Sequence, residues 1–452
     1  MTPEPTNAHP LDTTDFWTDL EPGQALSLEP FDRPVVLRPA KSPYVQTQVV
    51  EILSPTLQRL WEEPDRYDAA DYLLDGRRGA GPLVERLSED ADHLLITFLY
   101  RGDEDTRSVV VYGGPKPGTR SLSRFGRTNL WFLSEFSPIE ARYAYIFEEE
   151  QFSRDIRSEV IVKVIDLLDD LNPNHTVNGM SMLVLPASPA EGARRPRLPY
   201  SAKGSLYSHS VVTRHLRGRR HYSVYVPASG PTPQKSIAIA IFLDGEAFAS
   251  GWPSLDTGAF VPTPDILDFL IAEGTIPPLY AVFVEVGNTR HEDLIGNPAY
   301  ADFIADELLP SLRATYPGIS MDPRHVIIAG SSFGGLCAAF CGLQRPDALG
   351  NVLSMSGSFW VDVQGDIRDQ SEVREGLVQS GFVSRPKLPL RFHIEVGRFE
   401  DTDLLILPNR QLRDILIAKG YDVSFHQFLG NHDYMCWRDS VVRGLRRLTA
   451  NW

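Results

Sequence analysis

Cysteine is scarce in this chain of 452 residues, which contains three, at positions 337, 341 and 436. Three cysteines cannot form the disulfide framework of a small secreted protein. Cys337 and Cys341 lie four residues apart in a segment with a helical pattern, so we expect them to be packing groups. The Cys and His residues also lack the spacing of metal ligands, and we therefore expect no protein-bound metal or other cofactor.

Long apolar runs are missing as well, since no stretch reaches the roughly 20 residues needed to cross a bilayer. Residues 1–19 are rich in Pro, Thr and Asp and lack the basic segment and apolar run of a signal peptide. The formal net charge of −15 argues against nucleic acid and anionic membranes as partners. We expect a cytoplasmic protein, in which a local arginine cluster can still bind a small anionic substrate.

Length and composition predict two domains. A chain of 452 residues exceeds one ordinary domain, and 42% hydrophobic with 23% charged residues is typical of soluble globular proteins. We expect a flexible tail at 1–20, a smaller β-sandwich-like domain at 21–175, a proline-rich linker at 176–205 and a catalytic domain at 206–452.

The residue patterns of the two domains differ. The first has a short helix at 55–63, capped by Ser54, followed by short apolar runs between turn residues, at 93–100, 108–112, 129–133 and 142–147. The second alternates strand-like runs with amphipathic helices, which predicts a mostly parallel sheet covered on both faces. Its strands are expected at 220–226, 237–243, 280–286, 325–329, 391–396 and 423–429. Its helices are expected at 263–272, 299–315, 335–343 and 408–419.

A Gly-Ser-Ser-Phe-Gly motif at 330–334 predicts a nucleophile. It matches Gly-x-Ser-x-Gly, follows the strand 325–329 and precedes a buried helix face, which is the strand–turn–helix arrangement of the α/β-hydrolase elbow. Small residues on both sides let Ser332 occupy the tight turn, and the backbone N–H of Phe333 would face the oxyanion. Ser331 points elsewhere. The alternative is a glycine-rich turn without chemistry.

His432 is the predicted general base, because the α/β-hydrolase order is serine, acid, histidine. It lies in the loop after the last predicted strand, whereas the sequence places His325, His393 and His426 in or beside strands as structural residues. An imidazole titrates near neutrality and can take and return a proton.

The acid should follow the strand 391–396. We favour Glu400 over Glu395, Asp401 and Asp403, and a Ser332–His432 dyad without an acid is the alternative. For the second oxyanion donor we expect the backbone N–H of Glu246, in the turn after the strand 237–243.

Four separated segments resemble the enterochelin (enterobactin) esterases. Residues 243–248 (Leu-Asp-Gly-Glu-Ala-Phe) are similar to the family's early Leu-Asp-Gly turn, and 331–335 (Ser-Ser-Phe-Gly-Gly) to its elbow. Residues 396–400 (Val-Gly-Arg-Phe-Glu) are similar to its acid segment. The most specific match is 430–438 (Gly-Asn-His-Asp-Tyr-Met-Cys-Trp-Arg). Segments of the first domain, such as 142–147, also resemble the family.

This resemblance implies a serine esterase that cleaves the lactone bonds of a ferric tricatecholate siderophore in the cytoplasm. Iron would enter inside the substrate rather than as a cofactor. Arg290, Arg398, Arg438 and Trp437 are the candidate substrate-binding residues, because such a ligand is trianionic and aromatic; the alternative is surface arginines and a packing tryptophan. Departures around Asn129 and Arg290 leave the siderophore open. The rival functions are a general carboxylesterase or feruloyl-type esterase, and a binding protein with a vestigial hydrolase.

Overall fold

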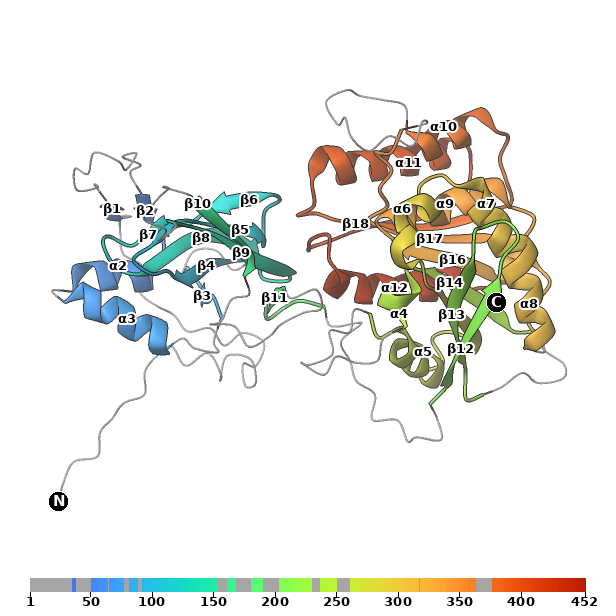
Figure 1. Cartoon of the computed structure of the whole chain (residues 1–452), viewed down its shortest axis with the longest axis horizontal. Helices are drawn as coiled ribbons and strands as arrows, with labels where there is room; N and C mark the ends of the chain where they lie inside the picture. The colour runs from blue at the N-terminus through green and yellow to red at the C-terminus, as the bar shows by residue number, and fades with distance from the viewer. Residues whose placement is uncertain are drawn as a thin grey trace, which may run out of the picture. The chain divides into compact units, whose positions relative to one another are not determined.

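The chain divides into two units, Met1–Pro189 and Ala190–Trp452 (Figure 1). A computed structural model of the protein describes residues 35–37, 50–63, 65–76, 81–87, 92–152, 161–167, 180–189, 203–229, 236–249, 261–316, 318–362 and 376–452. The predicted tail at 1–20 lies outside the described residues. The range predicted as a linker contains the strand β11 (Ser181–Val184), which pairs with β9 of the first unit.

The first unit contains two larger antiparallel sheets. One has the order β3 (Leu83–Glu85), β4 (His93–Arg101), β8 (Leu130–Pro138) and β7 (Ser123–Arg124). The other has the order β10 (Ile161–Leu167), β9 (Arg142–Phe152), β5 (Thr106–Gly113) and β6 (Thr119–Ser121), with β11 added beside β9. A pair of short strands, β1 (Val35–Leu37) and β2 (Val50–Ile52), and the helices α2 (Pro55–Glu62) and α3 (Arg66–Gly76) precede them.

Aromatic side chains join the two larger sheets. Phe98 of β4 lies 4.9 Å from Tyr145 of β9 between ring centroids, and Tyr100 lies 5.2 Å from Phe147. The predicted strands of this unit are confirmed, and so is the cap of α2, where the Ser54 hydroxyl accepts a hydrogen bond from the N–H of Leu57 at 3.2 Å. A side-chain acceptor at this position satisfies a helix N–H that has no intrahelical partner.

The second unit is built on one eight-stranded sheet. Its order is β12 (Ser205–Val212), β13 (Arg219–Val226), β15 (Leu279–Val284), β14 (Ala238–Leu243), β16 (Val326–Ser331), β17 (Asn351–Met355), β18 (Arg391–Gly397) and β19 (Asp422–Phe428). The strands from β15 to β19 in this order run parallel, and β13 is antiparallel to both of its neighbours. The predicted mostly parallel sheet of an α/β-hydrolase-like fold is confirmed.

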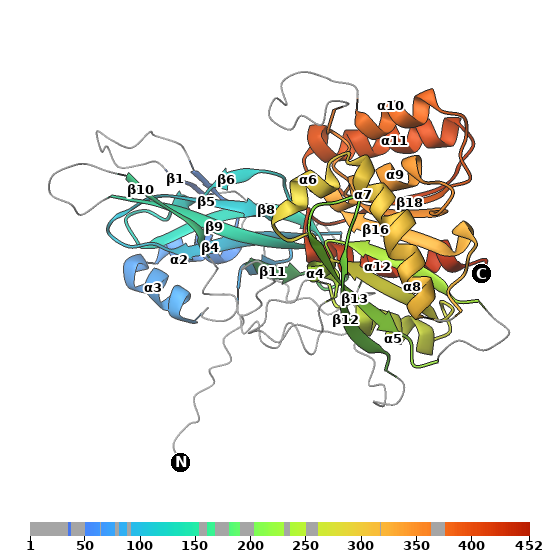
Figure 2. The same ribbon diagram turned by 45° about the vertical axis from the view of Figure 1, so that its right-hand side comes forward.

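Helices cover both faces of this sheet, because its central strands are apolar on both sides. Figure 2 shows the helices of one face, which are α6 (Arg290–Leu294), α7 (Pro298–Asp302), α8 (Leu309–Thr315), α9 (Phe333–Gln344), α10 (Leu377–Ser384) and α11 (Leu407–Ala418). The opposite face packs against α4 (Gly245–Phe248), α5 (Thr263–Ala272) and α12 (Tyr434–Thr449).

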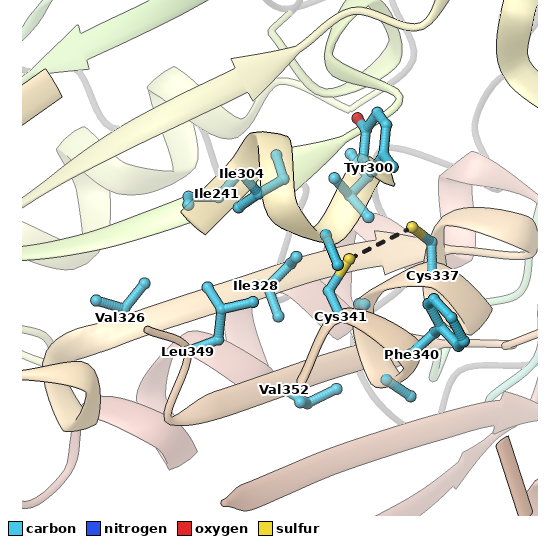
Figure 3. Packing of buried hydrophobic residues seen from close by; sticks show 14 of the residues in the cluster. Ile241, Tyr300, Ile304, Val326, Ile328, Cys337, Phe340, Cys341, Leu349 and Val352 are labelled. Atoms are coloured by element: carbon cyan, nitrogen blue, oxygen red, sulfur yellow. Dashed lines mark hydrogen bonds between the residues drawn. The ribbon is translucent and has the colours of Figure 1, made fainter. Parts of the chain in front are cut away.

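The elbow helix α9 is fully embedded in the core. Figure 3 shows Cys337 and Cys341 on this helix on the side of Tyr300 and Ile304, with Ile328 of β16 beside Cys341. The two sulfur atoms lie 3.7 Å apart, and both thiols are free and buried. Their prediction as packing groups is therefore confirmed. A helix buried on all sides fixes the position of its own first turn, where the predicted nucleophile lies.

Some elements differ from the sequence predictions. The helix expected at 299–315 consists of α7, a π-helical segment at Phe303–Leu308 and α8. The strands β12 and β17 and the helix α12 were not predicted. The five residues of β17 include the polar Asn351 and Ser354, so no continuous apolar run marks this strand, and the residues that begin α12 were interpreted as a loop. These omissions matter, because β17 and α12 both border the site described below.

Candidate active site

The predicted nucleophile occupies a strained turn between β16 and α9. Ser332 has φ 56° and ψ −121°, a backbone conformation that costs a residue with a side chain free energy. Among the described non-glycine residues, only Asp244, Ser332 and Ser356 have a positive φ. These three residues directly follow β14, β16 and β17, so strain is concentrated where neighbouring parallel strands end.

Glycines make this turn possible, as the motif predicted. A Cβ atom on Gly330 would lie 2.4 Å from the carbonyl carbon of Gly334, and one on Gly335 would lie 2.8 Å from the Oγ of Ser354. Both distances are shorter than real Cβ contacts. The first turn of α9 therefore packs directly on the end of β16, which leaves the Ser332 side chain at the edge of the sheet.

The hydroxyl of Ser332 lies 3.3 Å from the hydroxyl of Ser358, in the loop after β17. The neighbouring Ser331 is different: its Oγ is buried and has no hydrogen-bond partner among the described residues. Ser331 and Ser332 therefore point in different directions, as expected for this turn. Phe333 begins α9, so its N–H belongs to the first helical turn, whose N–H groups have no acceptor within the helix.

Glu400 contacts His432 directly. The Nδ1 atom of His432 lies 2.8 Å from Oε2 of Glu400, which is buried at 3% exposure. Asp401 instead caps the next helical segment, because its Oδ1 accepts the N–H groups of Asp403 and Leu404 at 2.9 and 2.8 Å. Of the carboxylates considered from the sequence, Glu400 is thus the one whose contact suits the acid.

The loop after β17 links the serine to the Glu400–His432 pair. Ser358 contacts Ser332, and the hydroxyl of Ser356 donates to Oε1 of Glu400 at 2.6 Å. In the part of the chain that is described, no hydrogen bond joins Ser332 to His432 directly. Such contacts are often long in the absence of substrate and shorten when it binds.

The candidate substrate-binding residues have different surroundings. Arg290 is 31% exposed and binds both carboxylate oxygens of Asp244, at 2.6 and 2.8 Å. Its guanidinium carbon also lies 5.4 Å from the ring centroid of Phe333. Arg398 is exposed in the loop that carries Glu400. Both arginine side chains therefore have solvent-exposed surface that a ligand can contact.

Trp437 and Arg438 are buried, at 3% and 7% exposure, in the first turn of α12. Burial leaves them little surface to offer a ligand, which favours the packing alternative. The Trp437 ring meets the His432 ring edge-on, with centroids 4.9 Å apart. We therefore reassign Trp437 from substrate contact to the support of His432.

Sequence reasoning missed an aromatic group around Phe333, the residue that follows the predicted nucleophile. The Phe333 ring lies 5.4 Å from that of His291 and 6.0 Å from that of Trp360, between centroids. Phe333 and Trp360 are half-buried and His291 is exposed. These rings, together with Arg290, give the surroundings of Ser332 flat and cationic surfaces. The three aromatic residues are far apart in the sequence, so no local pattern indicates that they lie together. His291 does follow Arg290, a predicted substrate-binding residue.

The turn after β14 is held from two sides. Its Asp244 is bound by Arg290, and the carboxylate of Glu246 accepts the N–H groups of Val286 and Gly287 at 3.3 and 3.2 Å. A Cβ atom on Gly245 would lie 2.3 Å from the carbonyl carbon of Phe283, so the backbone here lies against β15. The position of the predicted second oxyanion donor, the N–H of Glu246, is thus fixed.

The esterase family model matches residues 213–448, more than half of the chain. The chain belongs to the esterase family. It is a carboxylic ester hydrolase, and its relatives make the resemblance more specific. The iron(III) enterobactin esterase of Dickeya dadantii is 28% identical over 437 residues, covering 86% of this esterase and 94% of that protein. The corresponding protein of Escherichia coli O6:H1 is 28% identical and covers 81% and 93%. The resemblance to enterochelin esterases is confirmed.

The fold of this esterase agrees with a solved structure of that group. The ferric enterobactin esterase of Salmonella typhimurium superposes with a TM-score of 0.66 at 24% identity, covering 82% of this chain and 97% of that one. Over the described residues, this esterase has no helix with the length and apolar character required to cross a bilayer. Within the same residues, His, Cys, Asp and Glu side chains form no group of three or more suited to a metal ion.

A second buried carboxylate of the esterase, Glu395, anchors α12 to β18. It accepts hydrogen bonds from Arg443 at 2.9 and 2.6 Å and from Ser440 at 2.6 Å, and His393 lies 2.7 Å away. Burial alone would raise the pKa of Glu395, but the bonds from Arg443 and His393 outweigh burial and hold this pKa well below its ordinary value. Glu395 is therefore a structural anion and not the partner of His432.

Replacing Arg443 should destabilise the esterase. Arg443→Met leaves the Glu395 carboxylate buried without its main partner, so we expect the free energy of unfolding at neutral pH to fall by about 3–5 kcal/mol, measured by urea unfolding. Arg446→Met is the control on the same helix: its pair with Glu273, at 3.3 Å, is partly exposed and should contribute about 0–1 kcal/mol.

The loss of stability in Arg443→Met should depend on pH. A carboxyl whose pKa is lowered in the folded state stabilises the protein above its unfolded pKa of about 4.3, and this stability is lost as the pH falls toward the folded pKa. The difference between wild type and Arg443→Met should therefore shrink below about pH 4.3. Equal losses in the two arginine variants, or a difference independent of pH, would contradict the assignment.

Proposed function

We propose that this esterase hydrolyses the lactone bonds of a ferric tricatecholate siderophore, such as enterobactin, and releases its iron in the cytoplasm. Two relatives that match most of the chain are named iron(III) enterobactin esterases, which supports this substrate class. Iron would arrive bound to the substrate, with no cofactor held by the protein. The two aromatic-linked sheets of the first unit are consistent with a β-sandwich.

The observation that carries the proposal is the 2.8 Å contact between His432 and Glu400 at the same sheet edge as the elbow serine. Because Nδ1 of His432 is bound to a carboxylate, Nε2 is the nitrogen available for the serine proton. Strands β16, β18 and β19 are parallel, so the residues that follow them meet at one edge. Ligand sites of open α/β sheets occur at this edge.

The proposed reaction has two steps. The Oγ of Ser332 attacks the lactone carbonyl carbon while its proton moves to Nε2 of His432, and the N–H groups of Phe333 and Glu246 bind the oxyanion. The ester C–O bond breaks, the leaving alkoxide takes the proton, and an acyl-enzyme remains. Water then loses a proton to His432 and attacks the acyl carbon, the bond from that carbon to Oγ of Ser332 breaks, and His432 returns the proton to Oγ, which releases a carboxylic acid and restores Ser332.

Charge and shape near Ser332 suit an anionic aromatic acyl group. Arg398 is an exposed cation in the loop after β18, Arg290 begins α6 and is 31% exposed although it pairs with Asp244, and Phe333 and Trp360 offer aromatic faces. A catecholate can form ion pairs with the arginines and stack on the aromatic rings. Opening the lactone would lower iron affinity, because the linear product has lost the preorganised ring.

Product analysis tests the proposal. The esterase is incubated with ferric and iron-free trilactones, with simple aryl esters as comparison, and the products are separated and identified. We expect linear and shorter serine esters from the trilactones, with kcat/KM above that for aryl esters. Turnover of aryl esters alone would favour a general carboxylesterase. Failure of a fluorophosphonate probe to label Ser332 would favour a binding protein without hydrolase activity.

A further inference from the structure

Ser356 is a fully buried residue in an unfavourable backbone conformation directly after β17. Its φ is 50°, its exposure is 0%, and it lies two residues before Ser358, which contacts the nucleophile. Glycine would adopt this backbone without cost, whereas serine does not. A strained side chain retained at the edge of a candidate active site indicates that the hydroxyl itself has a use.

The direction of the Ser356 hydroxyl is fixed by Trp437. The indole Nε1 of Trp437 lies 3.0 Å from the Oγ of Ser356, and an indole N–H can only donate. Ser356 therefore accepts from Trp437 and keeps its single hydrogen for another acceptor. That acceptor is Oε1 of Glu400, at 2.6 Å. The chain of donors thus runs from Trp437 through Ser356 to Glu400.

Two donors hold one oxygen of the Glu400 carboxylate. Oε1 accepts from Ser356 and also from the backbone N–H of Gly397, at 2.6 Å. The other oxygen, Oε2, is thereby turned toward His432, which it contacts at 2.8 Å. The Trp437 ring that directs Ser356 also lies edge-on against the His432 ring. One buried residue of α12 therefore supports both members of the Glu400–His432 pair.

We propose that Ser356 is a positioning residue for catalysis, which orients the Glu400 carboxylate and, through it, the His432 imidazole. The inference rests on the proposed function to the extent that Ser332 and His432 perform ester hydrolysis. It does not depend on which ester is the natural substrate. Ser356 touches no reacting atom, so its loss should change the rate of the chemical step and leave substrate binding intact.

Two replacements of the same residue separate positioning from folding. Ser356→Ala removes the hydroxyl and keeps the strained backbone, whereas Ser356→Gly removes the hydroxyl and relieves the strain. We expect both to lower kcat by about 10- to 100-fold with KM unchanged, since loss of a group that orients a catalytic side chain has effects of this size. Ser356→Gly should have the higher Tm of the two.

The decisive comparison is between activity and stability. Equally low kcat in both variants, despite their different Tm values, supports positioning. If Ser356→Gly instead regained the wild-type kcat as its Tm rose above that of Ser356→Ala, the inference would be overturned. Activity would then depend on folding alone. Ser354→Ala is the matched control: this serine of β17 is equally buried, and its hydroxyl has no hydrogen-bond partner among the described residues. It should keep wild-type kcat.

Trp437→Phe provides a second test, since it keeps an aromatic ring against His432 and removes the N–H that directs Ser356. Its kcat should fall less than that of Ser356→Ala, because the serine hydroxyl can still reach Glu400. If kcat fell more in Trp437→Phe while Ser356→Ala kept the wild-type kcat, the effect would come from the packing of the Trp437 ring and not from the Ser356 hydroxyl.

All variants are measured with 4-nitrophenyl butyrate as well as with ferric enterobactin. If wild type cleaves only the aryl ester, the proposed siderophore substrate fails while the role of Ser356 is still measured. If wild type cleaves both esters and the two Ser356 variants match it, the positioning role fails and the proposed function stands. If wild type cleaves neither ester and leaves the fluorophosphonate probe unattached to Ser332, both ideas fail.

Discussion

Ser332→Ala should lower kcat for ester hydrolysis by about 10⁴-fold or more, because the proposed acyl-enzyme forms on the Oγ atom that this change removes. The folded state should be retained, since alanine occupies the same turn and, among the described residues, the Ser332 hydroxyl has only one weak partner, Ser358 at 3.3 Å. Steady-state kinetics on the trilactone and on an aryl ester measure the loss. A fluorophosphonate probe should label wild type and fail to label the variant.

The adjacent serine supplies the control for this experiment. Ser331→Ala removes a buried hydroxyl that has no hydrogen-bond partner among the described residues, one position before the predicted nucleophile. We expect its kcat to match wild type. Near-normal hydrolysis by Ser332→Ala, or loss in both variants, would show that the elbow serine is not the nucleophile.

The second large effect is expected at Glu400. Glu400→Gln should lower kcat by about 10³- to 10⁴-fold, because an amide can offer its NH₂ to Nδ1 and so leave the imidazole in the wrong tautomer to accept the serine proton. Nearly the same shape is retained, so KM and Tm should change little. The measurement is kcat at neutral pH, together with thermal unfolding.

Asp401→Asn is the matched control for Glu400. Asp401 caps the helical segment Thr402–Ile406, and asparagine caps helices about as well as aspartate. We expect wild-type kcat in this variant. Wild-type kcat in Glu400→Gln would support a Ser332–His432 dyad, and a large loss in Asp401→Asn instead would move the acid by one position.

The parts of this site that could be predicted from sequence are those with a local signature. The elbow needs small residues at fixed offsets from Ser332, and glycine at 330 and 334 is visible without a structure. His432 follows the last strand in a Gly-Asn turn, and the order of elements predicted it as the general base. The acid was harder to predict, because four candidate carboxylates lie within nine residues of one another in the sequence. Only their contacts in the structure distinguish them.

What could not be predicted depends on contacts between distant segments. Ser356 was not predicted because polar residues interrupt the apolar pattern of β17, and nothing local shows that its hydroxyl contacts Glu400, 44 positions later. Trp437 was interpreted as a substrate contact because it is close to His432 in sequence. The missing signal was the start of α12, where Asp433 accepts the N–H of Cys436 at 2.9 Å and turns Trp437 inward.

The three left-handed residues at the ends of β14, β16 and β17 have a consequence for any attempt to engineer this protein for heat resistance. Each costs roughly 1–2 kcal/mol relative to a relaxed backbone, and glycine would recover part of that free energy. At Ser332, whose hydroxyl has only a weak contact with Ser358 among the described residues, a selection that scored only survival at high temperature would therefore favour glycine, whereas glycine at Asp244 or Ser356 would also remove the hydrogen bonds of a buried side chain. The selected protein would be more stable to heat but would no longer hydrolyse its substrate.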